Sequence, residues 1–151
     1  MTKLQFYKEL KVDRDIDITE QLKNLIKDYD FNVETLSKYL ELDKNQINQL
    51  VDGNISFLPN DNEYRFNLFN KISFLYCSAI DEKDVKLDAF LKVLLSYHNI
   101  SKKTISKMSG VDIKEIDKFL SSKKSKISVE DKYKLAITTM SLRFFLKDVE
   151  K

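Results

Sequence analysis

The sequence is poor in the residues that interrupt or crosslink a chain. Its 151 residues include two glycines, one proline, one cysteine, one histidine and no tryptophan. So few glycines and prolines leave little material for hairpin turns, while long stretches favour the helix formers Leu, Lys, Glu and Gln. Cys77 cannot form a disulfide within the chain, and it lies in an apolar run that predicts burial. We therefore expect an all-α protein of a reducing cytoplasm.

The sequence also lacks the residue groupings of several functional classes. It has no apolar run of about 18 residues that could span a membrane, and no N-terminal segment typical of a signal peptide. His98, the one histidine, has no second histidine or nearby cysteine with which to bind a metal or activate a nucleophile. A glycine-rich phosphate loop is missing as well. We expect no enzymatic activity, no catalytic or metal-binding residues, no cofactor and no membrane association.

Residues 102–121 are the most informative stretch of the chain. Their sequence, KKTISKMSGVDIKEIDKFLS, places apolar residues only where two short, packed helices would bury them. Gly110 permits a left-handed turn between these helices, and Val111 would fill it. The inward side chains are expected to be Ile105 and Met108 in the first helix and Ile116, Phe119 and Leu120 in the second.

Capping signals mark the starts of helices along the whole chain. In a capping box, an Asp accepts from a backbone amide three residues later, whose Glu or Gln side chain accepts from the Asp amide. This spacing occurs in the pairs Asp17/Glu20, Asp43/Gln46 and Asp112/Glu115. Single caps are expected at Asn32, Ser101 and Ser128.

The helical pattern occurs twice in one register without a gap, in which residue 35 aligns with residue 104; we call this alignment the repeat register. Identical residues in it include the pairs Thr35/Thr104, Ser37/Ser106, Lys38/Lys107, Asp43/Asp112 and Tyr64/Tyr133, and Leu68/Ile137 keep apolar character. A shared helical rhythm would match apolar residues, but it would not also match these polar ones. The sequence thus predicts an internal repeat, with an N-terminal arm or short helix at 1–16, a first repeat at 17–81 and a second at 82–151.

The last helix of each repeat is expected to be apolar around most of its circumference. These closing helices are predicted at about 63–80 and 129–147, with the second start marked by Ser128 and Asp131. One small unit cannot cover such a helix on all sides, so each should contact the other repeat or another subunit. A homodimer would form through this surface.

Charge is distributed unevenly between the two halves. Residues 1–81 contain 10 basic and 14 acidic side chains, a net charge of −4, whereas residues 82–151 contain 16 and 10, a net charge of +6. The second half is therefore the better partner for a polyanion.

The caps, turns and repeated helices resemble the phage-repressor and XRE-type helix-turn-helix superfamily over most of residues 17–148. Gly110 matches the turn glycine of that family, Glu41 replaces it in the first repeat, and Ser37 and Ser106 stand where the family has a small residue. The resemblance implies two tandem lambda-repressor-like four-helix units. It further implies a sequence-specific DNA-binding transcriptional regulator of bacterial or phage type. The alternative is a protein-protein interaction module whose helix-turn-helix fold has lost DNA binding.

The resemblance places candidate contacts to double-stranded DNA on both repeats. Asn and Gln can pair bidentately with adenine, so the base-reading candidates are Lys44, Asn45, Asn48 and Gln49. The second repeat is richer in lysine, which suits phosphate. Its phosphate candidates are Lys102, Lys103, Lys107, Lys114, Lys118, Lys123, Lys124 and Lys126. Two solvated helix faces without a ligand are the alternative.

Overall fold

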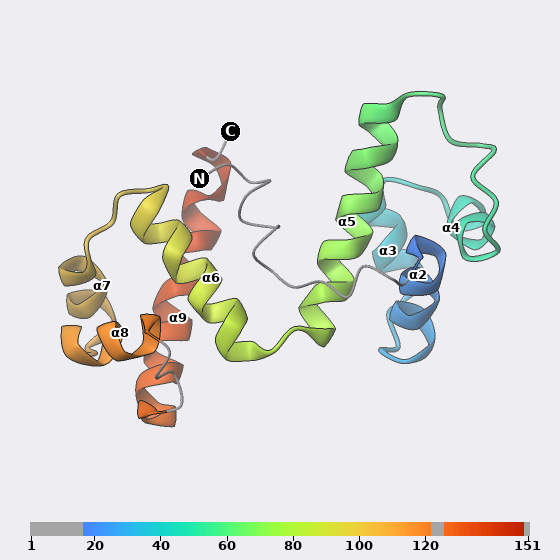
Figure 1. The fold of residues 1–151 in the computed structure, drawn as a ribbon. Coiled ribbons are helices and arrows are strands. Elements are labelled where there is room, and N and C mark those ends of the chain that lie inside the picture. Colours follow the sequence, from blue (N-terminus) through green and yellow to red (C-terminus); the bar gives the residue numbers. More distant parts are fainter. Residues whose placement is uncertain (1–16, 122–125, 150–151) are drawn as a thin grey trace. The chain divides into compact units, whose positions relative to one another are not determined.

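The structure is a computed structural model that describes residues 17–121 and 126–149. Within those ranges all regular structure is helical, which confirms the all-α class. The α-helices are α2 (Ile18–Lys27), α3 (Val33–Leu40), α4 (Lys44–Val51), α5 (Asn62–Ile80), α6 (Lys83–Ser96), α7 (Lys102–Ser109), α8 (Ile113–Leu120) and α9 (Val129–Leu146), and the 3-10 helix η2 (Lys147–Val149) follows (Figure 1). The predicted arm, 1–16, lies outside the described residues.

The chain divides after Asp81 into two compact units. The N-terminal unit contains α2 to α5, and the C-terminal unit contains α6 to α9. Only Asp81 and Glu82 separate α5 from α6. The Glu82 carboxylate accepts hydrogen bonds from the amides of Asp84 and Val85, so it caps α6. Each unit has its own apolar core.

The core of the N-terminal unit forms where α2 packs on α4 and α5 and where α3 packs on α4 and α5. It consists of Leu22, Leu36, Leu40, Leu42, Ile47, Leu50, Leu58, Leu68 and Ile72, all buried. Gln21 is buried as well, and its Oε1 accepts a hydrogen bond from Ser73 Oγ at 2.9 Å. Because this amide oxygen has a partner, burial of Gln21 is tolerated. Cys77 is buried, as expected.

The core of the C-terminal unit forms where α9 packs on α6 and α7 and where α7 packs on α8. In Figure 1, α6 and α9 lie side by side. The buried residues are Leu87, Leu91, Leu94, Ile105, Val111, Ile116, Phe119, Ile127 and Leu135. An ion pair between Lys132 of α9 and Asp84 of α6 joins these two helices at the edge of the core.

The two motif helices of each unit agree with the repeat register. α3 and α7 begin at aligned residues, 33 and 102, and end at aligned residues, 40 and 109; α4 and α8 agree in the same way. The left-handed residues also agree, since Asp30 and Glu41 have φ of 51° and 57° and their counterparts Asn99 and Gly110 have 52° and 74°. Buried side chains correspond too, in the pairs Leu22/Leu91, Leu36/Ile105, Leu42/Val111, Ile47/Ile116, Leu50/Phe119 and Leu58/Ile127.

The expected gap-free register does not extend to the closing helices. α5 begins at residue 62, which aligns with residue 131, but α9 already begins at residue 129. Leu68 is 4% exposed, whereas Ile137, its counterpart in the repeat register, is 54% exposed. When the two helix starts are aligned instead, Leu68 corresponds to the fully buried Leu135. The match of Tyr64 with Tyr133 therefore does not reflect equivalent positions in the two helices.

The shift arises in the loop that precedes the closing helix. Two residues, Pro59 and Asn60, separate buried Leu58 from the cap Asp61, whereas buried Ile127 is followed directly by the cap Ser128. Arg65 Nε donates to the Pro59 carbonyl at 2.8 Å, which holds the longer loop against the start of α5. Because the two loops differ by two residues, the closing helices of the two units bury residues that do not align in the repeat register.

The predicted burial of Met108 is wrong. Met108 is 57% exposed, while Ile105 on the same helix is fully buried. An eight-residue helix has about two turns, and α7 uses its inner face for contacts with α8 and α9. Tyr39, its counterpart in α3, is also exposed, and its hydroxyl donates to the Lys71 carbonyl at 3.0 Å.

Helix α9 is apolar on two opposite faces. Its inner face carries the buried Leu135 and Thr139, while an outer stripe of Tyr133, Ile137, Met140 and Phe144 is 49–65% exposed. The stripe residues follow each other at intervals of four, three and four, which keeps them in line along a helix. Phe145, on the same helix, is 74% exposed.

The contrast between Phe119 and Met108 gives a stability test. Phe119→Ala should lower the free energy of unfolding by about 3–5 kcal/mol, because it leaves a large cavity in the core. Met108→Ala should change it by less than about 0.5 kcal/mol, since this side chain lies at the surface. Urea unfolding followed by circular dichroism measures both. A loss of similar size in the two variants would show that Met108 is part of the core.

Candidate nucleic-acid interface

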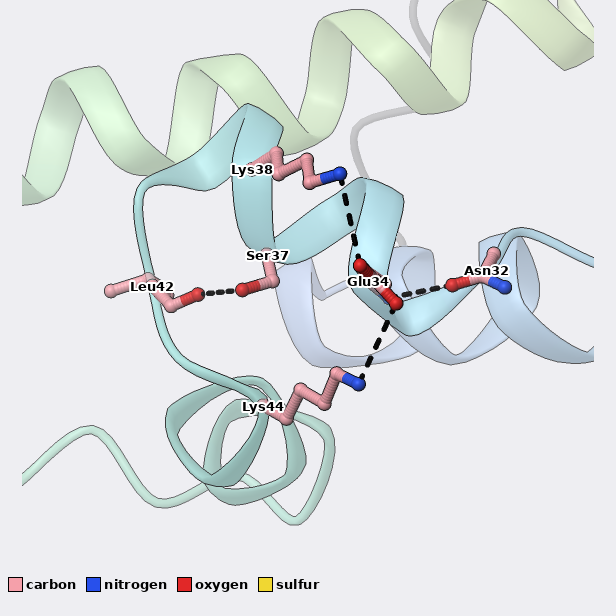
Figure 2. Close-up of polar contacts among 6 residues, drawn as sticks. All are labelled: Asn32, Glu34, Ser37, Lys38, Leu42 and Lys44. Carbon is pink, nitrogen blue, oxygen red and sulfur yellow. Dashed lines mark hydrogen bonds and ion pairs between the residues drawn. The ribbon is translucent and has the colours of Figure 1, made fainter.

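In each unit, two eight-residue helices are joined by a tight left-handed turn. In the N-terminal unit, Glu41 adopts φ 57° directly after α3, and the Ser37 hydroxyl donates to the carbonyl of Leu42 (Figure 2). In the C-terminal unit, Gly110 adopts φ 74° at the same place, and its amide donates to Ser106 O at 2.9 Å. A glycine takes this conformation without a side-chain penalty, whereas Glu does not. The first turn therefore depends more on hydrogen bonds around it.

The second helix of each motif starts at an Asp, but the two caps differ. Asp43 forms the expected capping box, since its carboxylate accepts from Gln46 N at 2.8 Å while Gln46 Oε1 accepts from Asp43 N at 3.0 Å. Asp112 accepts from Lys114 N at 2.8 Å, without the reciprocal bond that was expected from Glu115. The Glu115 carboxylate instead pairs with Lys118 at 2.5 Å.

The third expected capping box, at the start of α2, is also wrong. Asp17 is the N-cap residue there, but its side chain makes no capping hydrogen bond. The single caps expected at Asn32, Ser101 and Ser128 are confirmed, since each side chain accepts from a backbone amide in the first turn that follows.

The base-reading candidates of the N-terminal unit gather on the outer face of α4. Lys44, Asn45 and Asn48 are exposed, and Gln49 is half-buried. The Oε1 atom of Gln49 accepts a hydrogen bond from Asn54 Nδ2 at 3.3 Å. Asn45 and Asn48 lie one turn apart on the same side of the helix. α4 thus presents the exposed amides of Asn45 and Asn48 beside Gln49, whose side chain is held by the hydrogen bond from Asn54.

Lys44, at the start of α4, is engaged across the turn. Its Nζ lies 3.7 Å from Oε2 of Glu34, in α3, and Lys38 Nζ lies 3.7 Å from the other carboxylate oxygen (Figure 2). Both lysines are well exposed, so the pairs hold them only weakly. Sequence spacing could have indicated the Glu34–Lys38 pair, because its members are one helical turn apart in one helix.

The phosphate candidates of the C-terminal unit fall into three groups. Lys102 pairs with Asp117 at 2.5 Å, across the turn, and Lys118 pairs with Glu115. A second group is exposed and has no ion pair with any other described residue; it consists of Lys103, Lys107, Lys114 and Lys126. The two remaining candidates, Lys123 and Lys124, lie outside the described residues.

The two helix-turn-helix stretches carry opposite net charge. Residues 33–52 contain two basic and four acidic side chains, a net charge of −2. Residues 102–121 contain five basic and three acidic side chains, a net charge of +2. A polyanion therefore meets an attractive surface on the C-terminal motif and a repulsive one on the N-terminal motif.

His98 makes a local aromatic contact. Its ring lies edge-on to Tyr97, with the centroids 5.0 Å apart. Burial, and secondarily the charge of Arg143, lower the pKa of His98. Among the described residues no group of His, Cys, Asp or Glu could hold a metal ion. In the same part of the chain, no helix is both long and apolar enough to cross a membrane.

The different caps of α2 and α4 predict different effects of the same substitution. Asp43→Ala should destabilise the N-terminal unit by about 1–2 kcal/mol, because two reciprocal hydrogen bonds at the start of α4 are lost. Asp17→Ala should have a much smaller effect, since its side chain makes no capping hydrogen bond. Urea unfolding compares the two variants, and equal losses would contradict the assignment.

Comparison with known proteins gives one match. A family model described as a helix-turn-helix domain matches residues 13–151, which is most of the chain. No curated protein and no solved structure matches. Domains of this kind are, in general, the DNA-binding modules of regulators, in which the second helix of the motif enters the major groove.

Proposed function

Since the chain belongs to a family of helix-turn-helix domains, we propose that it is a sequence-specific, non-enzymatic DNA-binding regulator of bacterial or phage type. The observation that carries this proposal is the outer face of α4, where Asn45 and Asn48 stand exposed on a capped helix. Amide side chains of this kind can donate to and accept from the edge of adenine at the same time. We also propose that the protein acts in the cytoplasm.

The shared register of the motif helices supports two tandem units of the lambda-repressor-like type. Both units repeat the helix bounds of the motif, its left-handed turn and its buried positions in the repeat register. The shorter loop before α9 shifts the last helix, and α6 begins four residues earlier in the repeat register than α2, since residue 18 aligns with residue 87 and α6 begins at residue 83. In this proposal the two motifs derive from one duplicated unit whose surfaces then diverged.

The two units contribute different chemistry in this proposal. The N-terminal unit reads bases through Asn45, Asn48 and Gln49, with Lys44 at the start of the same helix. The C-terminal unit anchors the DNA backbone through its exposed lysines, Lys103, Lys107, Lys114 and Lys126, with Lys123 and Lys124 in the same stretch of sequence. Lys102 and Lys118 first have to leave Asp117 and Glu115, so they contribute less.

The division of roles predicts different losses for Asn48→Ala and Lys114→Ala. Asn48→Ala should weaken binding to a duplex selected from a random pool by about 5- to 150-fold, equivalent to about 1–3 kcal/mol, and leave binding to mixed-sequence DNA nearly unchanged. Lys114→Ala should weaken binding to both and reduce the slope of log K against log salt by about one unit. Fluorescence anisotropy at several salt concentrations measures all of these quantities.

Lys27→Ala provides the matched control, because Lys27 is an exposed lysine at the end of α2, outside both motifs. It should leave affinity and salt dependence close to wild type. Equal losses for Asn48→Ala on both duplexes would remove α4 as the base reader. Absence of wild-type binding at low salt would reject the DNA proposal in favour of a protein-interaction module.

The outer stripe of α9 supports self-association as a second part of the proposal. Tyr133, Ile137, Met140 and Phe144 have the spacing of a two-helix seam, and they lie opposite the face that the core uses. Of the charged residues beside the stripe, Lys134 pairs with Glu130 at 2.6 Å and Arg143 lies 5.7 Å from the centre of the Phe90 ring. The hydrogen bond between Lys134 and Glu130 raises the pKa of Lys134 and lowers the pKa of Glu130. Lys147 Nζ lies 4.7 Å from the centre of the Phe144 ring, so a second copy would meet this charge at the C-terminal end of the stripe.

Substitution within the stripe tests this homodimer. Ile137→Lys should shift the protein toward monomer, because the new charge would be buried in an apolar seam. Val85→Lys, which adds the same charge at an exposed site on α6, should leave the association unchanged. Sedimentation velocity over a wide concentration range measures the mass. A wild type that stays monomeric throughout would exclude the stripe as a dimer interface.

A further inference from the structure

Glu34 occupies an exposed position at the start of α3, beside the turn to α4. Its backbone amide donates to Asn32 Oδ1 at 2.7 Å, so the helix cap uses the main chain and leaves the carboxylate free to interact with other groups (Figure 2). The side chain is 59% exposed. A substitution of the carboxylate alone therefore leaves the start of α3 intact.

The Glu34 carboxylate engages the whole positive charge of the N-terminal motif. Lys38 and Lys44 are the two basic residues of the stretch 33–52, and each lies 3.7 Å from one oxygen of this carboxylate. Figure 2 shows Glu34 between them, with Lys38 on the same helix and Lys44 on the next. These are the cations that a DNA phosphate near α4 would otherwise attract.

The C-terminal unit has the opposite charge at the corresponding position. In the repeat register, which relates α3 to α7, Glu34 corresponds to Lys103. Lys103 is exposed and forms no ion pair within the described ranges 17–121 and 126–149. The same place on the motif thus attracts phosphate in one unit and repels it in the other.

We propose that Glu34 limits the affinity of the N-terminal motif for the DNA backbone. Its carboxylate competes with phosphate for Lys38 and Lys44, so α4 contributes base contacts with little affinity of its own for the DNA backbone. This inference rests on the proposed DNA binding. Stable binding then requires the lysines of the C-terminal unit, and the N-terminal motif adds energy only where its amides meet suitable bases.

The test is a gain of binding in the full-length Glu34→Gln variant on a mixed-sequence duplex. Release of two lysines should tighten binding by roughly threefold to thirtyfold at low salt and make the salt dependence steeper by about one to two units. Glu63→Gln is the matched control, because Glu63 is an exposed acid in the first turn of α5. It removes the same charge without releasing a lysine of the motif.

A mutant cycle separates lysine release from loss of repulsion. Lys38→Ala with Lys44→Ala should cost little in the wild type but abolish the gain in the Glu34→Gln background. Wild-type binding that Glu34→Gln leaves unchanged would overturn the inference alone, as would an equal gain in Glu63→Gln or a gain that survives loss of both lysines. Absence of binding by wild type and Glu34→Gln alike would overturn the proposed function together with it.

Discussion

The helix-turn-helix stretches depend on one constraint, which is that their helices are too short to be stable alone. Each of the four has eight residues, below the roughly 12–15 that an isolated helix needs in water. Their stability must come from the core and from side-chain caps. The left-handed residue between them makes this packing possible, because the residue that follows it, Leu42 or Val111, then enters the core.

The N-terminal turn meets this constraint less easily than the C-terminal one. A non-glycine residue in the left-handed region costs roughly 1–2 kcal/mol, and Glu41 bears that cost where Gly110 does not. The hydrogen bond from Ser37 to Leu42 spans the strained residue, and the reciprocal cap of α4 follows at Asp43. They offset the strain, so the orientation of α4 rests on polar contacts as well as on the core.

The sequence was sufficient to predict many features that involve neighbouring residues, but two of the three expected capping boxes do not form. The caps at Asn32 and Asp43, the left-handed turn at Gly110 and the buried stripes of α4 and α8 all depend on residues within one or two helical turns. The closing helices were harder to predict, because a helix that is apolar on most sides does not indicate which side faces the core. The buried face of α9 is set by the loop before Ser128, which is two residues shorter than the loop before Asp61. The two extra residues of the longer loop, Pro59 and Asn60, belong to no helix, so the helical pattern does not reveal this difference.

The charged site residues were predictable by position but not by partner. Lys102 and Asp117 lie on different helices of their motif, and so do Lys44 and Glu34. Such pairs form only once the two helices cross at a particular angle, which residue type does not determine. The partner of Glu115 was also not predictable from residue type. Its carboxylate pairs with Lys118 instead of completing the capping box with Asp112.

In the proposed function, one motif attracts the DNA backbone and the other reads the bases, and this division affects how selectively the protein binds. A contact to phosphate strengthens binding to every sequence equally, whereas a contact to a base edge strengthens only the matching one. A motif with exposed amides and neutralised lysines therefore widens the gap between specific and non-specific binding without raising the non-specific term. Because a genome offers a vast excess of competing sites, that gap determines occupancy more than total affinity does. The charge difference between residues 33–52 and 102–121 is consistent with such an arrangement, in which the N-terminal motif selects and the C-terminal motif holds.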